Sequence, residues 1–289
     1  MDRAKIEKKI EDAIKNVLNK LKEKEDSYIY NEISLQNELG IELREIFKNE
    51  NIRIFFEKNI KNCNIKNELI NEMVKKEIDL FIHDETKDEA YAIELKFIKR
   101  ENNRVLENLY DFVKDMRFME QIKENAKEYG TKIITAYVLT IVDDAIYMES
   151  KNKNSIGIYQ YFRNNKDDNN EEFFINICEE TIIVKPTKNE KLKNSSEHKE
   201  MLNVIKNEQN EEGKQKSLNK IIINNNLEED KAGVIYIKLK NNWNLEWQKI
   251  IEDTNYYAYC GKVTENNNGE YKVKNVKLDL NKGENNGII

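Results

Sequence analysis

The chain has 289 residues, of which 48 are Lys or Arg and 54 are Asp or Glu, so its formal net charge is −6. With two His, three Cys, nine Gly and one Pro, it has little material for a histidine-based triad, a zinc site or a glycine-rich phosphate loop. Hydrophobic residues make up 39% and charged residues 35%, which is typical of a globular chain with a sizeable core.

The first residues, MDRAKIEKKI, are charged and contain no apolar run, and no stretch reaches the ~18 apolar residues of a membrane-spanning helix. Cys63, Cys178 and Cys260 lie far apart, so neither a disulfide framework nor a cysteine-based zinc site is expected. We therefore expect a cytoplasmic protein that has no membrane partner.

Two amphipathic helices are predicted first, because apolar residues recur near every 3.6 positions over residues 3–24 and 32–48. Ser34 stands near the N-terminal cap of the second helix. The period then changes to alternation over residues 52–56, which indicates a strand that ends near Glu57.

A hairpin follows, since the β-rich runs EIDLFI (77–82) and AYAIELKFI (90–98) are joined by a short acidic turn. Helical spacing returns over residues 103–128. The run KIITAYVLTIV (132–142) is almost continuously apolar, as in a central strand covered on both faces. This order predicts an α/β (α+β) core in residues 1–150, with a mixed central sheet flanked by helices.

Residues 151–289 are less regular, and we expect a β-rich C-terminal extension that widens the sheet, selects substrate or mediates oligomerisation. Its strand candidates are 156–162, 173–177, 181–185, 233–239, 256–263 and 270–279, with a polar stretch at 187–220. The acidic excess falls wholly in residues 1–150. That excess argues against binding of nucleic acid through overall charge, but it is compatible with carboxylates that hold a metal ion.

Three charged residues on the predicted hairpin form a candidate site. Asp79 lies in the first strand, and Glu94 and Lys96 lie two apart in the second, so strand alternation sends these two to one face. Two carboxylates can hold Mg²⁺, with waters and a substrate phosphate as further ligands, while Lys96 positions the water or neutralises the oxyanion. The alternative is a solvated hairpin face with an ordinary ion pair.

The element order, Asp79 and the Glu94-Leu95-Lys96 triplet together resemble the PD-(D/E)XK nuclease superfamily, which has the restriction-endonuclease-like fold. Ile78 stands where the superfamily's name has Pro. Several segments resemble a bacterial group of that superfamily: NEISLQNELGIELREIF (31–47), FFE (55–57), IDLFI (78–82), AIELKF (92–97), LYDFVKDMRFMEQI (109–122), AYVLTIVDD (136–144) and, more weakly, residues 243–260.

The resemblance implies a nuclease that depends on Mg²⁺, or on Mn²⁺ in its place, with Asp79 and Glu94 as metal ligands and Lys96 as the catalytic lysine. Glu32 and Gln36, on the first core helix, would be auxiliary site residues. DNA is the expected substrate, restriction or phage defence the expected setting, and a homodimer would supply two sites for double-strand cleavage. RNA cleavage and a non-catalytic interaction module with the same fold are alternatives that the sequence leaves open.

Basic residues after the hairpin are candidates for holding substrate phosphates. A solvated cluster is equally favoured for Lys99, Arg100 and Arg104, and a position away from the site is favoured for Lys114 and Arg117 on the following helix.

Four other residues have two interpretations each. Glu77 shares a face with Asp79, but a surface residue at the strand end is favoured over a role in the site. His83 is similarly favoured as a surface residue over a ligand or base. Trp243 and Trp247 could stack on nucleobases, yet two Trp four apart are more often core anchors.

Overall fold

The computed structural model describes residues 1–21, 28–63, 65, 67–99, 105–125, 131–144, 165–166, 172–173, 176–177, 182–187, 221–223, 233–250, 256–266, 268–278 and 280. The chain divides into two compact units. The first unit comprises residues 1–102, 118–145 and 245–289, and the second comprises residues 103–117 and 146–244.

The first unit contains helices and one large sheet. Its helical elements are α1 (Arg3–Lys20), α2 (Glu32–Ile46), the 3₁₀ turn η1 (Ile60–Cys63), α3 (Asn67–Glu72) and the C-terminal part of α4 (Val105–Asn125). Its strands are β1 (Ile52–Asn59), β2 (Glu77–Asp84), β3 (Glu89–Ile98), β4 (Lys132–Val142), β12 (Gln248–Lys249), β13 (Tyr257–Glu265) and β14 (Tyr271–Asn275).

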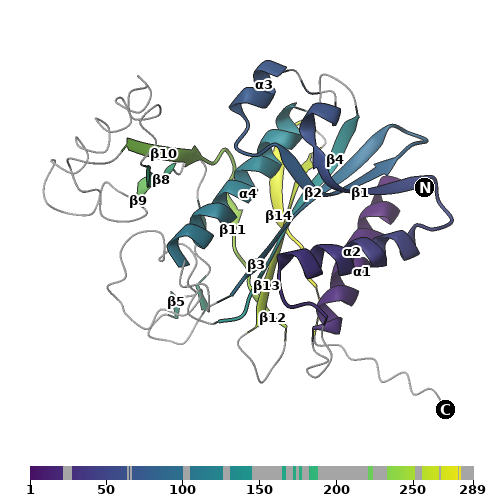
Figure 1. Ribbon diagram of the computed structural model, residues 1–289, viewed down its shortest axis with the longest axis horizontal. Coiled ribbons are helices and arrows are strands. Elements are labelled where there is room, and N and C mark those ends of the chain that lie inside the picture. The colour runs from purple at the N-terminus through teal and green to yellow at the C-terminus, as the bar shows by residue number, and fades with distance from the viewer. Residues whose placement is uncertain are drawn as a thin grey trace, which may run out of the picture. The chain divides into compact units, whose positions relative to one another are not determined.

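The sheet of the first unit is mixed, with the order β1-β2-β3-β4-β13-β12 and with β14 paired to β13. Strands β3 and β4 are parallel, and the other neighbours are antiparallel. The predicted hairpin and the predicted class, a mixed sheet flanked by helices with a strand-rich C-terminal region, are therefore confirmed (Figure 1). Residues 257–265 complete this sheet by pairing with β4, although they are more than 100 positions away in the sequence.

The second unit contains short strands and the first part of α4, up to Arg117. Its strands are β5 (Asn165–Lys166), β6 (Glu172–Phe173), β7 (Asn176–Ile177), β8 (Ile182–Thr187), β9 (Ile221–Ile223), β10 (Gly233–Lys238) and β11 (Trp243–Asn244). They pair as β10-β8-β9, β11-β7 and β5-β6. The strand expected at 173–177 is two short strands, and the one expected at 156–162 lies outside the described residues.

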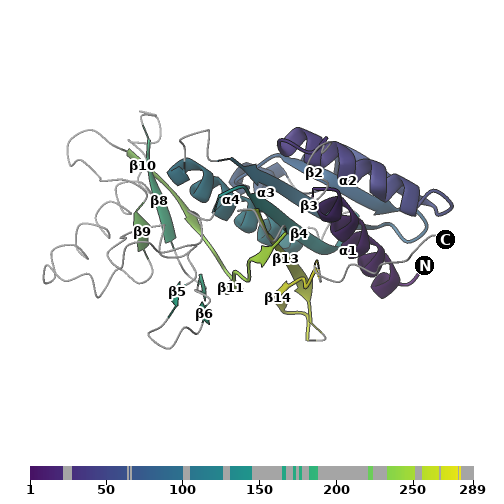
Figure 2. The ribbon, with the colours of Figure 1, turned by 90° about the horizontal axis from the view of Figure 1, so that it is seen from below.

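Helices α1 and α2 cover one face of the sheet (Figures 1 and 2). The apolar stripes of both helices join strand residues in one core cluster, for example Ile10 of α1, Leu39 of α2 and Leu95 of β3. Gly40 allows the close approach of α2 to β1, because a Cβ at this position would overlap the Phe56 ring. A larger residue at position 40 would therefore force the Phe56 ring to shift.

Polar contacts hold α1 against the sheet. The Lys262 ammonium of β13 donates to Glu7 at 2.8 Å and to Glu11 at 2.7 Å, and the Thr135 hydroxyl donates to Glu7 at 2.8 Å. Burial alone would lower the pKa of Lys262, but its hydrogen bonds to Glu11 and Glu7 outweigh this effect, so the pKa is raised. One lysine near the C-terminal end of the chain thus binds two acidic residues near the N-terminus.

Two local expectations are refined. The N-cap of α2 is Asn31, while Ser34 is the third helical residue and completes a capping box with it. Trp243 and Trp247 are buried, as core anchors would be, but neither lies in a helix. Within the part of the chain that the structure describes, no helix is long and apolar enough to cross a membrane.

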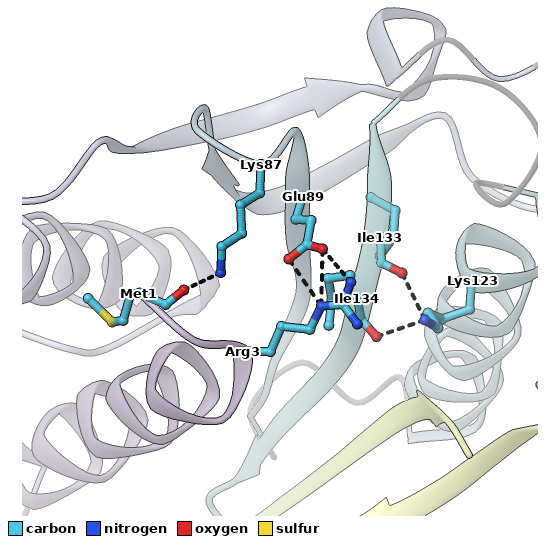
Figure 3. Close-up of polar contacts among 7 residues, drawn as sticks. All are labelled: Met1, Arg3, Lys87, Glu89, Lys123, Ile133 and Ile134. Atoms are coloured by element: carbon cyan, nitrogen blue, oxygen red, sulfur yellow. Dashed lines mark hydrogen bonds and ion pairs between the residues drawn. The ribbon is translucent and has the colours of Figure 1, made fainter. Parts of the chain in front are cut away.

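A buried lysine stabilises an irregularity between β3 and β4. The pairing of the two strands shifts between Ala90 and Tyr91, so that Ile134 is left out of the ladder. The Lys123 ammonium donates to the carbonyl oxygens of Ile133 at 2.8 Å and Ile134 at 2.7 Å (Figure 3), and this lysine is only 2% exposed. It therefore supplies a buried donor to two carbonyl oxygens at the point where the ladder shifts.

Lys123→Met should lower the free energy of unfolding by about 2 kcal/mol or more, because it leaves two buried carbonyls without this donor. Chemical denaturation measures the change. Lys87→Met is the matched control: Lys87 donates to the Met1 carbonyl at an exposed position, so its loss should cost less than about 0.5 kcal/mol. Equal costs for the two variants would contradict the structural role of Lys123.

Acid should weaken the contact of α1 with the start of β3. The hydrogen bond from Arg3 is the main reason that the pKa of Glu89 lies below its ordinary value. A carboxylate whose pKa is lowered by folding stabilises the protein above its unfolded pKa and loses that contribution as the pH falls. Glu89→Gln and Arg3→Gln should therefore cost more stability at pH 7 than at about pH 3, which is below the ordinary pKa of Glu. Denaturation at both pH values tests this, and a cost independent of pH would contradict it.

Candidate active site

Strands β2 and β3 part at Asp79 and Glu94. Their ladder runs from the Asp84–Glu89 pair to the Leu80–Ile93 pair and contains no Asp79–Glu94 pair. Beyond this point, β2 continues beside β1 and β3 continues beside β4. The sheet therefore forks at the two carboxylates that the sequence predicts as metal ligands.

The two acids replace the missing ladder bonds with side-chain bonds. The Asp79 amide donates to Glu94 Oε1 at 3.3 Å, and the Leu95 amide donates to Asp79 Oδ2 at 2.7 Å. Each carboxylate thus accepts from the backbone of the opposite strand. Because backbone amides in a sheet need partners, this exchange fixes both acids at the fork.

Glu94 is fully buried as a side chain, and a lysine compensates its charge. Lys75, in the connection between α3 and β2, donates through Nζ to Glu94 Oε2. An uncompensated carboxylate is costly to bury, so a cation at this position is an electrostatic requirement. No local sequence pattern identifies Lys75, which is separated from Glu94 by 19 positions.

Helix α2 contributes the two auxiliary residues that the resemblance implies. Glu32, its first residue, lies 3.0 Å from the Lys96 ammonium of β3. Gln36, one turn later and 9% exposed, donates through Nε2 to the Asp79 carbonyl at 2.8 Å and to Glu57 Oε1 at 2.6 Å. Gln36, Asp79 and Glu94 are therefore in contact through one network, and Glu32 pairs with Lys96.

Glu57 is a member of this network that sequence analysis did not identify. It stands opposite Asp79 in the β1–β2 register, between the pairs Phe56–Leu80 and Lys58–Ile78, but makes no ladder pair. Its φ of 47° is in the left-handed region, which costs a non-glycine residue about 1 kcal/mol or more. Such strain is concentrated at functional sites, where the surrounding contacts maintain it.

The carboxylates fit a magnesium ion by donor type. Among the described residues, no three or more His, Cys, Asp or Glu side chains are grouped as a complete protein cage would require. Mg²⁺ does not need such a cage, since it usually keeps several waters and binds one or two carboxylates. The ammonium group already beside Glu94 shows that this position attracts a cation.

The remaining predicted residues are placed as follows. Lys99 lies just beyond β3, with its ammonium 6.0 Å from the centre of the Phe97 ring. Lys114 and Arg117 belong to α4 in the second unit, whereas Arg100 and Arg104 lie outside the described residues.

The alternative candidates for catalysis lie elsewhere or are unreactive. Glu77 is an exposed residue at the start of β2, as expected. His83 is four residues from Asp79 along β2, roughly 13 Å away, and contacts Asp88 at 3.0 Å. Burial raises the pKa of the Cys63 thiol to about 11, so that it is not a thiolate nucleophile near neutral pH.

Comparisons with models of known protein families, with curated proteins and with solved structures find no match for this chain.

Replacing Glu57 should show whether its backbone is strained. Glu57→Gly and Glu57→Ala both lose the carboxylate, but only alanine keeps a Cβ at positive φ. The glycine variant should therefore be about 1 kcal/mol more stable than the alanine variant in chemical denaturation. Equal stabilities would show that residue 57 has ordinary strand conformation.

Proposed function

We propose that this protein is a metal-dependent nuclease that hydrolyses phosphodiester bonds, with DNA as its expected substrate. The fork between β2 and β3 is the observation that carries the proposal. It gathers Asp79 and Glu94 at one point, and β3 carries Lys96 two residues further along. Carboxylates with an adjacent lysine are the groups that metal-assisted phosphodiester hydrolysis requires.

Asp79 and Glu94 would hold Mg²⁺ or Mn²⁺. The bound ion would supply charge stabilisation at the scissile phosphate and a water of lowered pKa. Lys96 would orient the attacking water or neutralise the charge that develops on phosphate oxygen. Glu32 positions the Lys96 ammonium, and Gln36 holds the Asp79 backbone, so both residues of α2 act through the groups that touch the substrate or metal.

The topology supports membership of the PD-(D/E)XK superfamily as part of this proposal. The antiparallel β1-β2-β3 meander, the return through α4 and the parallel β4 give the element order of that fold. Fold alone does not determine activity, so the proposal depends on the site residues.

Lysines near the fork could offset the overall acidity. Lys76 lies three residues before Asp79, and Lys61 lies in η1. The pKa of Lys76 is lowered mainly by burial and also by the nearby positive charge of Lys61. Lys58 of β1 adds a third positive charge to this edge of the sheet. A phosphate backbone could therefore approach the fork although the chain is acidic as a whole.

A non-catalytic interaction module remains a second candidate, and one observation favours it. Glu94 is paired with Lys75, and Lys96 with Glu32, so the charges of the site are compensated within the protein. Calorimetric titration with Mg²⁺ and Mn²⁺ separates the candidates, since such a module has no need to bind either ion. RNA cleavage would use the same chemistry and differ in substrate recognition.

The nuclease should cut DNA only when Mg²⁺ or Mn²⁺ is present. Asp79→Asn, Glu94→Gln and Lys96→Met should each lower the rate by about 100-fold or more, because each removes a charge from the reacting centre while keeping the side chain's size. A panel of single- and double-stranded DNA and RNA, resolved on gels, measures the rates and identifies the substrate.

Two exposed residues provide matched controls. Glu77 lies on β2 near Asp79 and is replaced by Gln, and Lys132 lies at the start of β4 and is replaced by Met. Both variants should cut at the wild-type rate. Undiminished cutting by Lys96→Met would refute the assigned chemistry.

A further inference from the structure

The Glu94 carboxylate has a different partner on each oxygen. Oε1 accepts from the Asp79 amide at 3.3 Å, and Oε2 accepts from the Lys75 ammonium. The Lys75 side chain is 26% exposed, whereas that of Glu94 is 0% exposed. The ammonium also lies 5.8 Å from the centre of the Phe118 ring, whose face attracts cations. Lys75 thus reaches from the surface to a fully buried charge.

A metal ion on Glu94 would compete with this ammonium. Both are cations that stabilise the same buried carboxylate, and at neighbouring positions in a site of low polarity they would repel each other strongly. One neighbouring cation therefore stabilises the buried Glu94 carboxylate, whereas two would repel each other.

The Lys75 side chain lies partly at the surface. Its side chain begins in the connection before β2, outside the regular elements, and is partly exposed, so its head can move toward water while the stem stays in place. Lys75 differs in this respect from Lys123 of the same unit, which is 2% exposed and donates to two carbonyl oxygens.

We propose that Lys75 is the resident cation of Glu94 in the metal-free protein, and that it sets the metal affinity of the site because it must leave Glu94 when the ion binds. Lys75 is thus a positioning residue of the metal site. The inference rests on the proposed function, since it assumes that Glu94 is a metal ligand.

Removing the charge of Lys75 should lower the melting temperature of the metal-free protein and should increase the rise in melting temperature that metal binding causes. In EDTA, Lys75→Met should melt several degrees below the wild type, because the buried carboxylate loses its cation. With millimolar Mn²⁺ or Mg²⁺, it should gain more thermal stability than the wild type, because binding no longer has to displace an ammonium. Its metal dissociation constant, measured by calorimetry, should fall by about 10-fold or more.

Lys75→Gln is the second variant, because its amide can still donate to Glu94 while the charge is removed. If Lys75→Met does not fold, Lys75→Gln should still bind Mn²⁺ more tightly than the wild type. Glu94→Gln is the site control, and it should abolish metal binding whether or not Lys75 is present.

The outcomes separate the inference from the proposed function. Metal binding that is lost in Glu94→Gln but unchanged in both Lys75 variants would overturn the role of Lys75 and leave the nuclease proposal intact. A folded wild type and folded Lys75 variants that bind neither Mg²⁺ nor Mn²⁺ would overturn the metal-dependent nuclease, and the inference with it. Tighter binding in the Lys75 variants supports both.

Discussion

The exchange of hydrogen bonds between Asp79 and Glu94 is the interaction on which the site depends. Where two strands part, their backbone groups lose partners, and an unsatisfied buried amide costs free energy comparable to a lost hydrogen bond. Here the carboxylates of the opposite strand replace those partners. The same contacts therefore end the β2–β3 ladder and fix two acids close together. They also bury Glu94, and a buried carboxylate requires a cation.

Helix α2 and strand β1 are organised around the same fork. Asp79 pairs in the ladder with neither β1 nor β3, and its carbonyl accepts from the Gln36 side chain instead. Gln36 also binds Glu57, whose backbone leaves the strand conformation opposite Asp79. A helix side chain thus substitutes for a missing strand partner, at the expense of strain in β1. Gly40 of the same helix faces the ring of Phe56, the neighbour of Glu57 in β1.

The net charge of the chain describes this site poorly. Several acids of the N-terminal half are paired within the fold: Glu89 with Arg3, and Glu7 and Glu11 with Lys262. Of these cations only Lys262 lies outside residues 1–150, so it offsets one charge of the acidic excess in that half. Since Lys262 is remote in sequence from its partners, a charge count over residues 1–150 could not include it. Local lysines near the fork matter more to an approaching phosphate than the formal total.

The sequence by itself predicted the order of the main helices and strands over residues 3–142, apart from η1 and α3, and it named the residues of the candidate site. Periodicity is a local property, so it located the hairpin that carries Asp79, Glu94 and Lys96 and the helix that carries Glu32. Only the tertiary structure decided the partners. Neither Lys75 on Glu94 nor the backbone of Glu57 follows from any local pattern, because both depend on contacts between segments about 20 positions apart. The pairing of β13 with β4 likewise joins segments that are far apart in the sequence. It could not be predicted locally, because the unpaired backbone groups of a strand edge do not specify which distant strand will bind them.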